Sequence, residues 1–169
     1  MTSDKPSKWY ERTNSSFYDE ITKDVIRKRY IFETLLKTNN KENVLEIMKQ
    51  TFARQQADLA EAHRQNTPSL TSYKDYKQAM KQVLESTQKN HLVYSTKEDS
   101  DEKLEFRVTK CIFSDVCNEL DSTELGYAIF CYGDYDYAKT LHPKGRMVRN
   151  RTLMQGDAFC DHTYVWEDV

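Results

Sequence analysis

Three cysteines in the second half of the chain lie in segments that folding can bring together. Cys111 ends a predicted strand, Cys131 lies in a predicted helix and Cys160 lies in the last predicted strand. A thiolate is a strong nucleophile and a ligand for soft metals. The sequence therefore predicts either a cysteine-dependent reaction or a thiol ligand site, with simple burial of the thiols as the structural alternative.

The helix that contains Cys131 also carries an acidic group at a matching position. Cys131 and Asp134 are three residues apart and therefore share one helix face. A carboxylate beside a thiol can transfer protons in a reaction, which favours a catalytic interpretation. The alternative is a cysteine buried as a small apolar side chain next to a solvated aspartate. The sequence leaves these two interpretations equally open.

The last predicted strand places Cys160 and His162 two residues apart, and hence on one face. A neighbouring imidazole lowers the pKa of a thiol and can carry protons. Residues two apart on a strand are separated by about 6 to 7 Å, however, which is long for a direct hydrogen bond. We therefore expect Cys160 to belong to the functional pocket and His162 to tune it rather than act as its essential base.

Metal binding is the other use of clustered thiols. Structural zinc sites contain cysteine pairs two to four residues apart, whereas the closest two cysteines here, Cys111 and Cys117, are six positions apart. A site built from Cys111, Cys131 and Cys160 with Asp134 or His162 is chemically allowed. The spacing nevertheless predicts no bound metal, and we expect no cofactor and a packing role for Cys117.

The strands that position these thiols show a period of two. Residues 91–96 and 103–113 alternate on either side of an acidic turn, which predicts an antiparallel hairpin. Strict alternation places Cys111 on the face opposite Val108. Residues 146–153 and 157–167 predict a last pair of strands.

Helices account for the other elements. A short helix is predicted from Ser114 to about Leu120, and a longer one from about Ser122 to Leu141. Before them, apolar side chains recur near a period of 3.6 in three segments. These segments run from Ser16 to Leu35, from Lys41 towards His63, and from Ser72 to about Thr87.

Helices first and strands later predict an α+β fold, in which a helical N-terminal half packs on a mainly antiparallel sheet formed by the C-terminal half. We expect one domain over residues 1–169, with a helical part at about 16–88 and an α+β part at about 91–167. The uncovered face of such a sheet is available for a site or for a contact in a homo-oligomer, and the sequence does not choose between them.

Composition restricts the partners. The formal net charge is −2, and Lys and Arg are interleaved with Asp and Glu, which argues against nucleic acid. No long apolar run predicts a membrane span, and the N-terminal residues lack the apolar segment of a secretion signal. We therefore expect a cytoplasmic protein with reduced thiols whose partner is a small-molecule substrate.

Three segments in order, "CIFSDVCNEL", "LGYAIFCYGDYDYA" and "RTLMQGDAFCDHTY", resemble the L-2-amino-thiazoline-4-carboxylic acid hydrolase family. Members of that family show a Cys that opens a short helix, a later Phe/Leu-Cys-x-x-Asp helix and a terminal Arg-Thr element with Gly-Asp-x-x-Cys-Asp. The resemblance covers roughly Arg107 to Trp166. The residues at its motif positions are Cys111, Cys131, Asp134, Gly156, Asp157, Cys160 and Asp161.

The resemblance implies a bacterial hydrolase of non-peptide C–N or C–S bonds. The namesake reaction opens a cyclic isothiourea-like ring, an intermediate on a bacterial route to L-cysteine, to give a carbamoyl-cysteine. Such chemistry needs attack on an amidine carbon, a proton for the leaving atom and a cation for the substrate carboxylate. A thiolate at Cys131 or Cys160 is the candidate nucleophile, with Cys111 beside them in the catalytic set. Asp134 is the candidate proton donor, and Arg149 or Arg151 could bind the carboxylate bidentately.

The chain departs from the family pattern at His162 and Thr163, where an aromatic residue and then commonly a basic one follow Cys-Asp. This difference bears on the substrate, and we place His162 among the residues that contact it. Asp157 is expected to form a turn, and Asp161 to fix a backbone segment or an arginine. The competing hypothesis is a non-catalytic domain that binds a small ligand or a metal through the same thiols.

Overall fold

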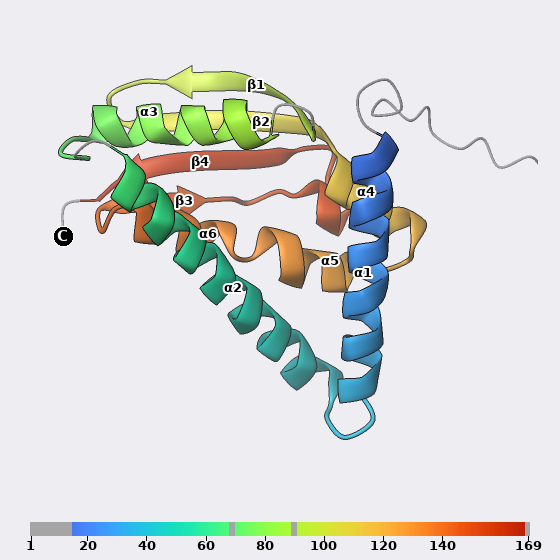
Figure 1. Ribbon diagram of the computed structural model, residues 1–169. Coiled ribbons are helices and arrows are strands. Elements are labelled where there is room, and N and C mark those ends of the chain that lie inside the picture. The colour runs from blue at the N-terminus through green and yellow to red at the C-terminus, as the bar shows by residue number, and fades with distance from the viewer. Residues whose placement is uncertain (1–14, 68–69, 89–90, 168–169) are drawn as a thin grey trace, which may run out of the picture.

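Helices pack beneath one face of a four-stranded sheet in the computed structural model, which describes residues 15–67, 70–88 and 91–167 (Figure 1). The α+β prediction is confirmed, because the helices of the N-terminal half precede an antiparallel sheet in the C-terminal half. Residues 1–14, which carry the expectation of no secretion signal, lie outside the described part of the chain. Within that part, every helix is too short or too polar to cross a membrane.

The three helices of the first half follow the predicted amphipathic segments. They are α1 (Ser15–Leu35), α2 (Lys41–Asn66) and α3 (Tyr73–Val83). A capping box starts α3, in which Ser72 and Asp75 each accept a hydrogen bond from the backbone N–H of the other. A π-helical segment, η1 (Leu84–Gln88), continues α3 towards the sheet.

The long helix predicted from about Ser122 to Leu141 is divided. Its parts are α5 (Thr123–Gly126), the π-helical η2 (Tyr127–Cys131) and α6 (Asp134–Leu141). The Tyr132 amide bonds the Tyr127 carbonyl at 2.9 Å, a wider turn than an α-helix makes, and a turn at Tyr132 and Gly133 follows. Single π turns of this kind occur often at functional sites. The preceding short helix, α4 (Ile112–Glu119), begins directly after the second strand.

The sheet has the strand order β1-β2-β4-β3, and all neighbours are antiparallel. Its strands are β1 (Leu92–Asp99), β2 (Lys103–Cys111), β3 (Gly145–Val148) and β4 (Cys160–Trp166). The strand predicted at 146–153 is therefore shorter than expected. The chain leaves β3 after Val148 and forms a loop and a short 3-10 helix, η3 (Leu153–Gln155).

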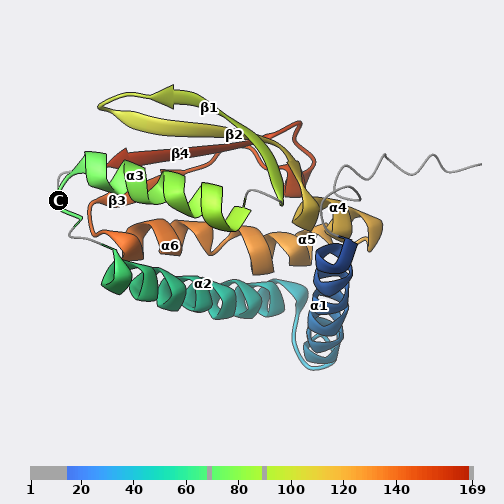
Figure 2. The same ribbon diagram turned by 45° about the horizontal axis from the view of Figure 1, so that its top comes forward.

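The largest core cluster lies between the sheet and the helices. Phe106 of β2 and Tyr164 of β4 pack there with Tyr76 of α3 and Leu141 of α6. Figure 2 shows α3 beneath the strands and α6 between the sheet and α2. The covered face of the sheet is thus apolar wherever helices reach it.

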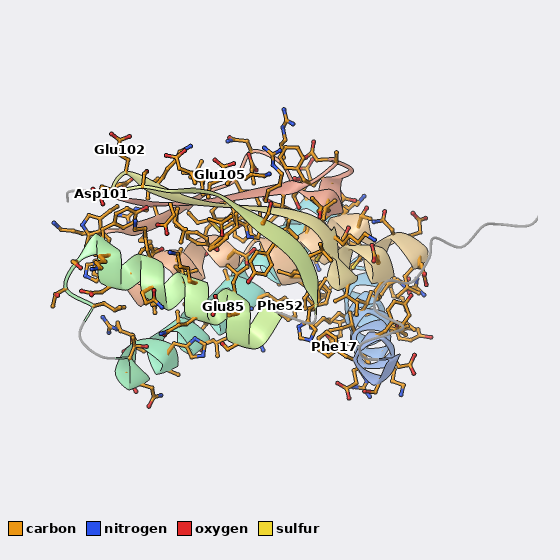
Figure 3. The ribbon with its side chains drawn as sticks, turned by 90° about the horizontal axis from the view of Figure 1, so that it is seen from above. Phe17, Phe52, Glu85, Asp101, Glu102 and Glu105 are labelled. Carbon is orange, nitrogen blue, oxygen red and sulfur yellow. The ribbon has the colours of Figure 1, made fainter. Side chains whose placement is uncertain are left out.

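The outer face of the sheet is charged instead. Figure 3, which shows the molecule from above the view of Figure 1, shows Glu105 on the sheet and Asp101 and Glu102 near the hairpin tip. Lys103 forms ion pairs with Glu98 at 3.0 Å and with Glu105 at 3.3 Å. Charged edge and surface residues of this kind discourage pairing with other sheets.

A smaller cluster explains one cysteine. Cys117 of α4 is fully buried against Ile21 and Val25 of α1 and against Met154 of η3. The expected packing role of Cys117 is confirmed.

The contact between Gly145 and Tyr76 yields a stability prediction. A Cβ atom at Gly145 would lie 2.5 Å from Tyr76 Cε2, and the ring is fully buried. Gly145→Ala should therefore lower the free energy of unfolding by about 1–3 kcal/mol, as overpacked core positions do. Urea unfolding measures this, with Val148→Thr as the control because Val148 lies on the same strand and is 44% exposed. Equal stability of both variants would contradict the close packing.

Candidate active site

A cavity of about 280 Å³ lies between the sheet and the helices, and all three predicted thiols line it. It also contains other groups with the expected chemistry. The cysteine and charged or titratable residues named from the sequence that line it are Cys111, Cys131, Asp134, Arg149, Cys160 and His162. Arg151 is not among the residues that line the cavity. The fold thus assembles the proposed residues from β2, η2, α6, β4 and the segment after β3.

A bulge brings Cys111 to the cavity. Val93 pairs with Lys110 but Tyr94 pairs with Val108, so Thr109 is an extra residue in β2. An extra residue reverses the alternation of side chains beyond it. The prediction that Cys111 lies on the face opposite Val108 is therefore wrong, since both residues line the cavity.

Arg149 is the central charged group of the site. Its side chain is only 2% exposed, and Nη1 donates to Asp134 Oδ2 at 2.8 Å. Nη2 donates to the Cys131 carbonyl oxygen at 2.8 Å, where the π segment ends. The guanidinium also lies over the rings of Tyr127 and Tyr135, at 5.7 and 5.1 Å from their centroids.

Asp134 opens α6 and remains 33% exposed. Burial raises the pKa of its carboxyl, and the charge and hydrogen bond of Arg149 lower it by a smaller amount. A carboxyl group whose pKa is raised holds a proton more readily than a solvated one. Asp134 therefore combines a fixed position with the ability to transfer a proton.

The backbone segment that carries Arg149 is fixed by Asp161. Asp161 Oδ1 accepts hydrogen bonds from the amides of Asn150 at 2.9 Å and Arg151 at 2.7 Å. The expectation that Asp161 fixes a backbone segment is confirmed. These amides bond a side chain instead of a neighbouring strand, which accounts for the early end of β3. The Arg151 side chain is exposed and lies over the Phe159 ring, 5.1 Å from its centroid.

The next turn presents the Cys160 thiol. Asp157 Oδ2 accepts from the Thr152 amide at 2.8 Å, and Gly156 adopts the left-handed conformation with φ 92° that favours glycine. The expected turn-forming role of Asp157 is confirmed. Cys160 is 7% exposed, and its Sγ accepts a hydrogen bond from the Leu153 amide at 3.2 Å.

His162 lies beside Arg149 instead of bonding Cys160. Its Nε2 is 3.5 Å from Arg149 Nη1. Burial and the nearby Arg149 charge lower the pKa of His162 to about 3. The imidazole is consequently neutral near pH 7, so it is not a cation that could stabilise a thiolate.

The other two thiols are in less favourable surroundings for ionisation. Burial raises the pKa of Cys111 to about 12, although the amides of Ser114 and Phe113 oppose this. Burial also raises the pKa of Cys131 well above its usual value, although Arg149 opposes this. Cys111 and Cys131 are therefore neutral thiols at pH 7.

Two further polar residues of the cavity were missed in the sequence. His63 Nδ1 of α2 and the Tyr137 hydroxyl of α6 are 2.5 Å apart, and both residues line the cavity. Tyr137 follows Asp134 by three positions, so the shared helix face was a usable signal. Nothing in the sequence linked His63 to this site, because its helix carries an ordinary amphipathic pattern.

The arrangement of donors does not form a metal centre. In residues 15–67, 70–88 and 91–167, no three His, Cys, Asp or Glu side chains come together in a way that could hold a metal ion. The thiols lie near enough to share a cavity but not in a ligand cluster.

Comparison with known proteins gives a family match over most of the chain. The family model described as L-2-amino-thiazoline-4-carboxylic acid hydrolase matches residues 18–164. The match includes the helical half, where the sequence motifs gave no specific signal. No curated protein matches the chain.

The lowered pKa of His162 predicts a pH-dependent stability. Between pH 6.5 and about 3 the unfolded chain binds a proton at this residue and the folded chain does not, so stability falls as the pH falls. The contribution is up to about 1.4 kcal/mol for each pH unit below ~6.5. His162→Phe should therefore lose less stability than the parent chain from pH 7.5 to 5 in urea unfolding. Thr163→Val, a neighbouring change without a titrating group, should retain the parent slope; equal slopes for all three proteins would rule out a buried neutral His162.

The spacing of the thiols predicts low metal content. Protein purified without added metal should carry substantially less than one zinc per chain, because zinc sites need a close set of ligands. Plasma emission spectrometry after dialysis measures this. Near-stoichiometric zinc that survives dialysis would make the thiols ligands and give Asp134 a supporting or ligating role.

Proposed function

The chain belongs to the L-2-amino-thiazoline-4-carboxylic acid hydrolase family, and on this premise we propose that it hydrolyses a C–N or C–S bond of a small cyclic substrate. The observation that carries the proposal is the meeting of Cys160, Cys131 and Asp134 in one cavity. A thiol nucleophile and a proton-transfer group are the two components that such a ring opening requires.

We assign the nucleophile to Cys160. The Leu153 amide donates to its sulfur at 3.2 Å, and the thiol donates to Thr152 Oγ1 at 3.6 Å, so the sulfur is held in a fixed position. Burial raises the pKa of the Cys111 and Cys131 thiols, which disfavours either of them as the nucleophile. In this assignment they form the neutral walls of the reaction site.

In this proposal Asp134 is a carboxylate paired with Arg149 in the resting site, and during the reaction it takes up a proton and passes it to the leaving atom. Arg149 contacts one carboxylate oxygen, Oδ2, and a third of the side chain remains exposed, so proton transfer takes place at Oδ1. Arg149 keeps the carboxylate oriented throughout, which is a positioning role. In this assignment His162 is a neutral imidazole that lies beside the Arg149 guanidinium, and it does not act as a base.

The reaction balances with one water molecule. As the Cys160 sulfur bonds to the ring carbon of the C=N group, the thiol proton passes to Asp134 and the electron pair of the C=N bond moves to nitrogen. The C=N bond re-forms as the ring C–S or C–N bond breaks, and Asp134 gives the proton to the leaving atom. Water then adds to the same carbon, one of its protons goes to nitrogen and the other to the departing Cys160 sulfur, and its oxygen becomes the carbonyl oxygen of the product.

The free thiols of the cysteines also favour a reducing compartment of the cell. All four cysteines are free thiols, which persist in reducing surroundings. We therefore propose a cytoplasmic location in a bacterial cell, which fractionation followed by immunoblotting would test.

Substitution of the nucleophile and its neighbour separates the proposed roles. Cys160→Ser should lower kcat/KM by at least ~10³-fold in hydrolysis of thiazolines or related cyclic ureas, because the covalent step is lost. His162→Phe should keep much of the activity, since it restores an aromatic residue. Cys117→Ala is the control, because Cys117 is buried away from the cavity.

Three outcomes would change the assignment. A folded His162→Phe protein as inactive as Cys160→Ser would favour a Cys-His catalytic pair. Full activity of Cys160→Ser would transfer the nucleophile to Cys131 with Asp134. Inactivity of the parent chain on every compound would favour a domain that binds a ligand without converting it.

A further inference from the structure

Much of the cavity is lined by apolar side chains that the ring-opening reaction does not use. They come from separate elements of both halves of the chain and surround the volume of about 280 Å³. Six of them are Leu59 of α2, Val83 of α3, Leu84 of η1, Leu92 of β1, Phe113 of α4 and Phe130 of η2. A thiazoline ring with an amino group and a carboxylate would fill only part of this volume and would leave these side chains uncovered.

The residues that line the cavity differ in exposure. Arg149 is 2% exposed and Cys160 is 7% exposed, whereas Leu59 is 46% exposed. Arg149 and Cys160 therefore lie deep in the cavity, where Leu84 is also buried, and Leu59 lies at its opening. A ligand held at Cys160 would reach the apolar residues with whatever substituent its ring carries.

The charges in the cavity are already compensated. Among the residues that the structure describes, Arg149 is the one lining residue with a permanent positive charge, and Asp134 pairs with it at 2.8 Å. Arg151, the other candidate for a substrate carboxylate, projects over Phe159 outside the cavity. His63, the remaining titratable imidazole of the lining, is engaged by the Tyr137 hydroxyl. A carboxylate placed among these groups would lose its hydration without gaining a free cation, which is costly.

We propose that the substrate of this chain is a cyclic C=N compound that lacks a carboxylate and carries an alkyl or aryl substituent. The apolar substituent lies against Leu59, Val83 and Phe113 while the ring carbon faces Cys160. This inference rests on the proposed function for the identity of the reacting ring. It differs from the family's namesake substrate in the group attached to that ring.

Binding of aromatic 2-aminothiazoles tests the inference without requiring catalysis, because their C=N bond is part of an aromatic ring and resists the attack that opens a thiazoline. Titration calorimetry with the full chain would compare 4-phenyl-2-aminothiazole, 4-methyl-2-aminothiazole and 2-aminothiazole-4-carboxylate. The phenyl compound should bind at least ~tenfold more tightly than the carboxylate, with the methyl compound between them. A carboxylate that binds as tightly as the phenyl compound, or no binding of the phenyl compound, would overturn the inference.

A matched pair of variants on α2 locates the substituent. Leu59 and Ile47 are both 46% exposed, but Ile47 does not line the cavity. Leu59→Gln should weaken binding of the phenyl compound by about fivefold and leave the carboxylate unaffected, whereas Ile47→Gln should change neither. Equal effects of the two variants would place the substituent elsewhere and contradict the proposal.

Hydrolysis of the corresponding thiazolines separates this inference from the proposed function. Tight binding of the phenyl thiazole with no turnover of any thiazoline would support the ligand class and contradict the hydrolase. Turnover of the carboxylate thiazoline together with preferred binding of the carboxylate thiazole would support the hydrolase and overturn the ligand class.

Discussion

The buried guanidinium of Arg149 is the interaction on which the rest of the site depends. Removing this charge from water is costly, and the cost is met only because Asp134 and the Cys131 carbonyl accept its protons. These acceptors belong to the end of η2 and the start of α6, where the helical path is interrupted. An unbroken α-helix would use the Cys131 carbonyl for its own hydrogen bonding, so the division of the helix and the burial of Arg149 require each other.

The loop after β3 also helps to hold Arg149 in its buried position. Arg149 is the first residue after the strand, and the amides that follow it need acceptors outside the sheet. Asp161 takes two of them and Asp157 takes a third. The turn closes at Gly156, and Cys160 follows with its sulfur directed at the Leu153 amide. The spacing of Cys160, Asp157 and Asp161 is thus the spacing of one hydrogen-bonded loop.

Local periodicity was enough to predict much of this fold. The amphipathic period located α1, α2 and α3, and alternation placed Cys160 and His162 on one face. It failed at Cys111, because no glycine or proline marks the extra residue Thr109 in β2. Periodicity also does not show where backbone amides bond a side chain instead of a neighbouring strand, so the early end of β3 was not predicted. Both errors concern pairing partners distant in sequence, which local patterns do not specify.

The sequence predicted which residues belong to the site better than it predicted the role of each residue, and the reason is electrostatic. Arg149 was expected to bind a substrate carboxylate because a cation near reactive thiols suits that task. Whether a cation is free depends on which carboxylate it meets in three dimensions, and here that partner is Asp134. Arg149 and Asp134 act on the Cys131 thiol with opposite sign, so burial decides its protonation, and burial likewise keeps Cys111 protonated although two backbone amides oppose it. We therefore place the proposed nucleophile at Cys160, whose sulfur the Leu153 amide holds in position on the loop after β3.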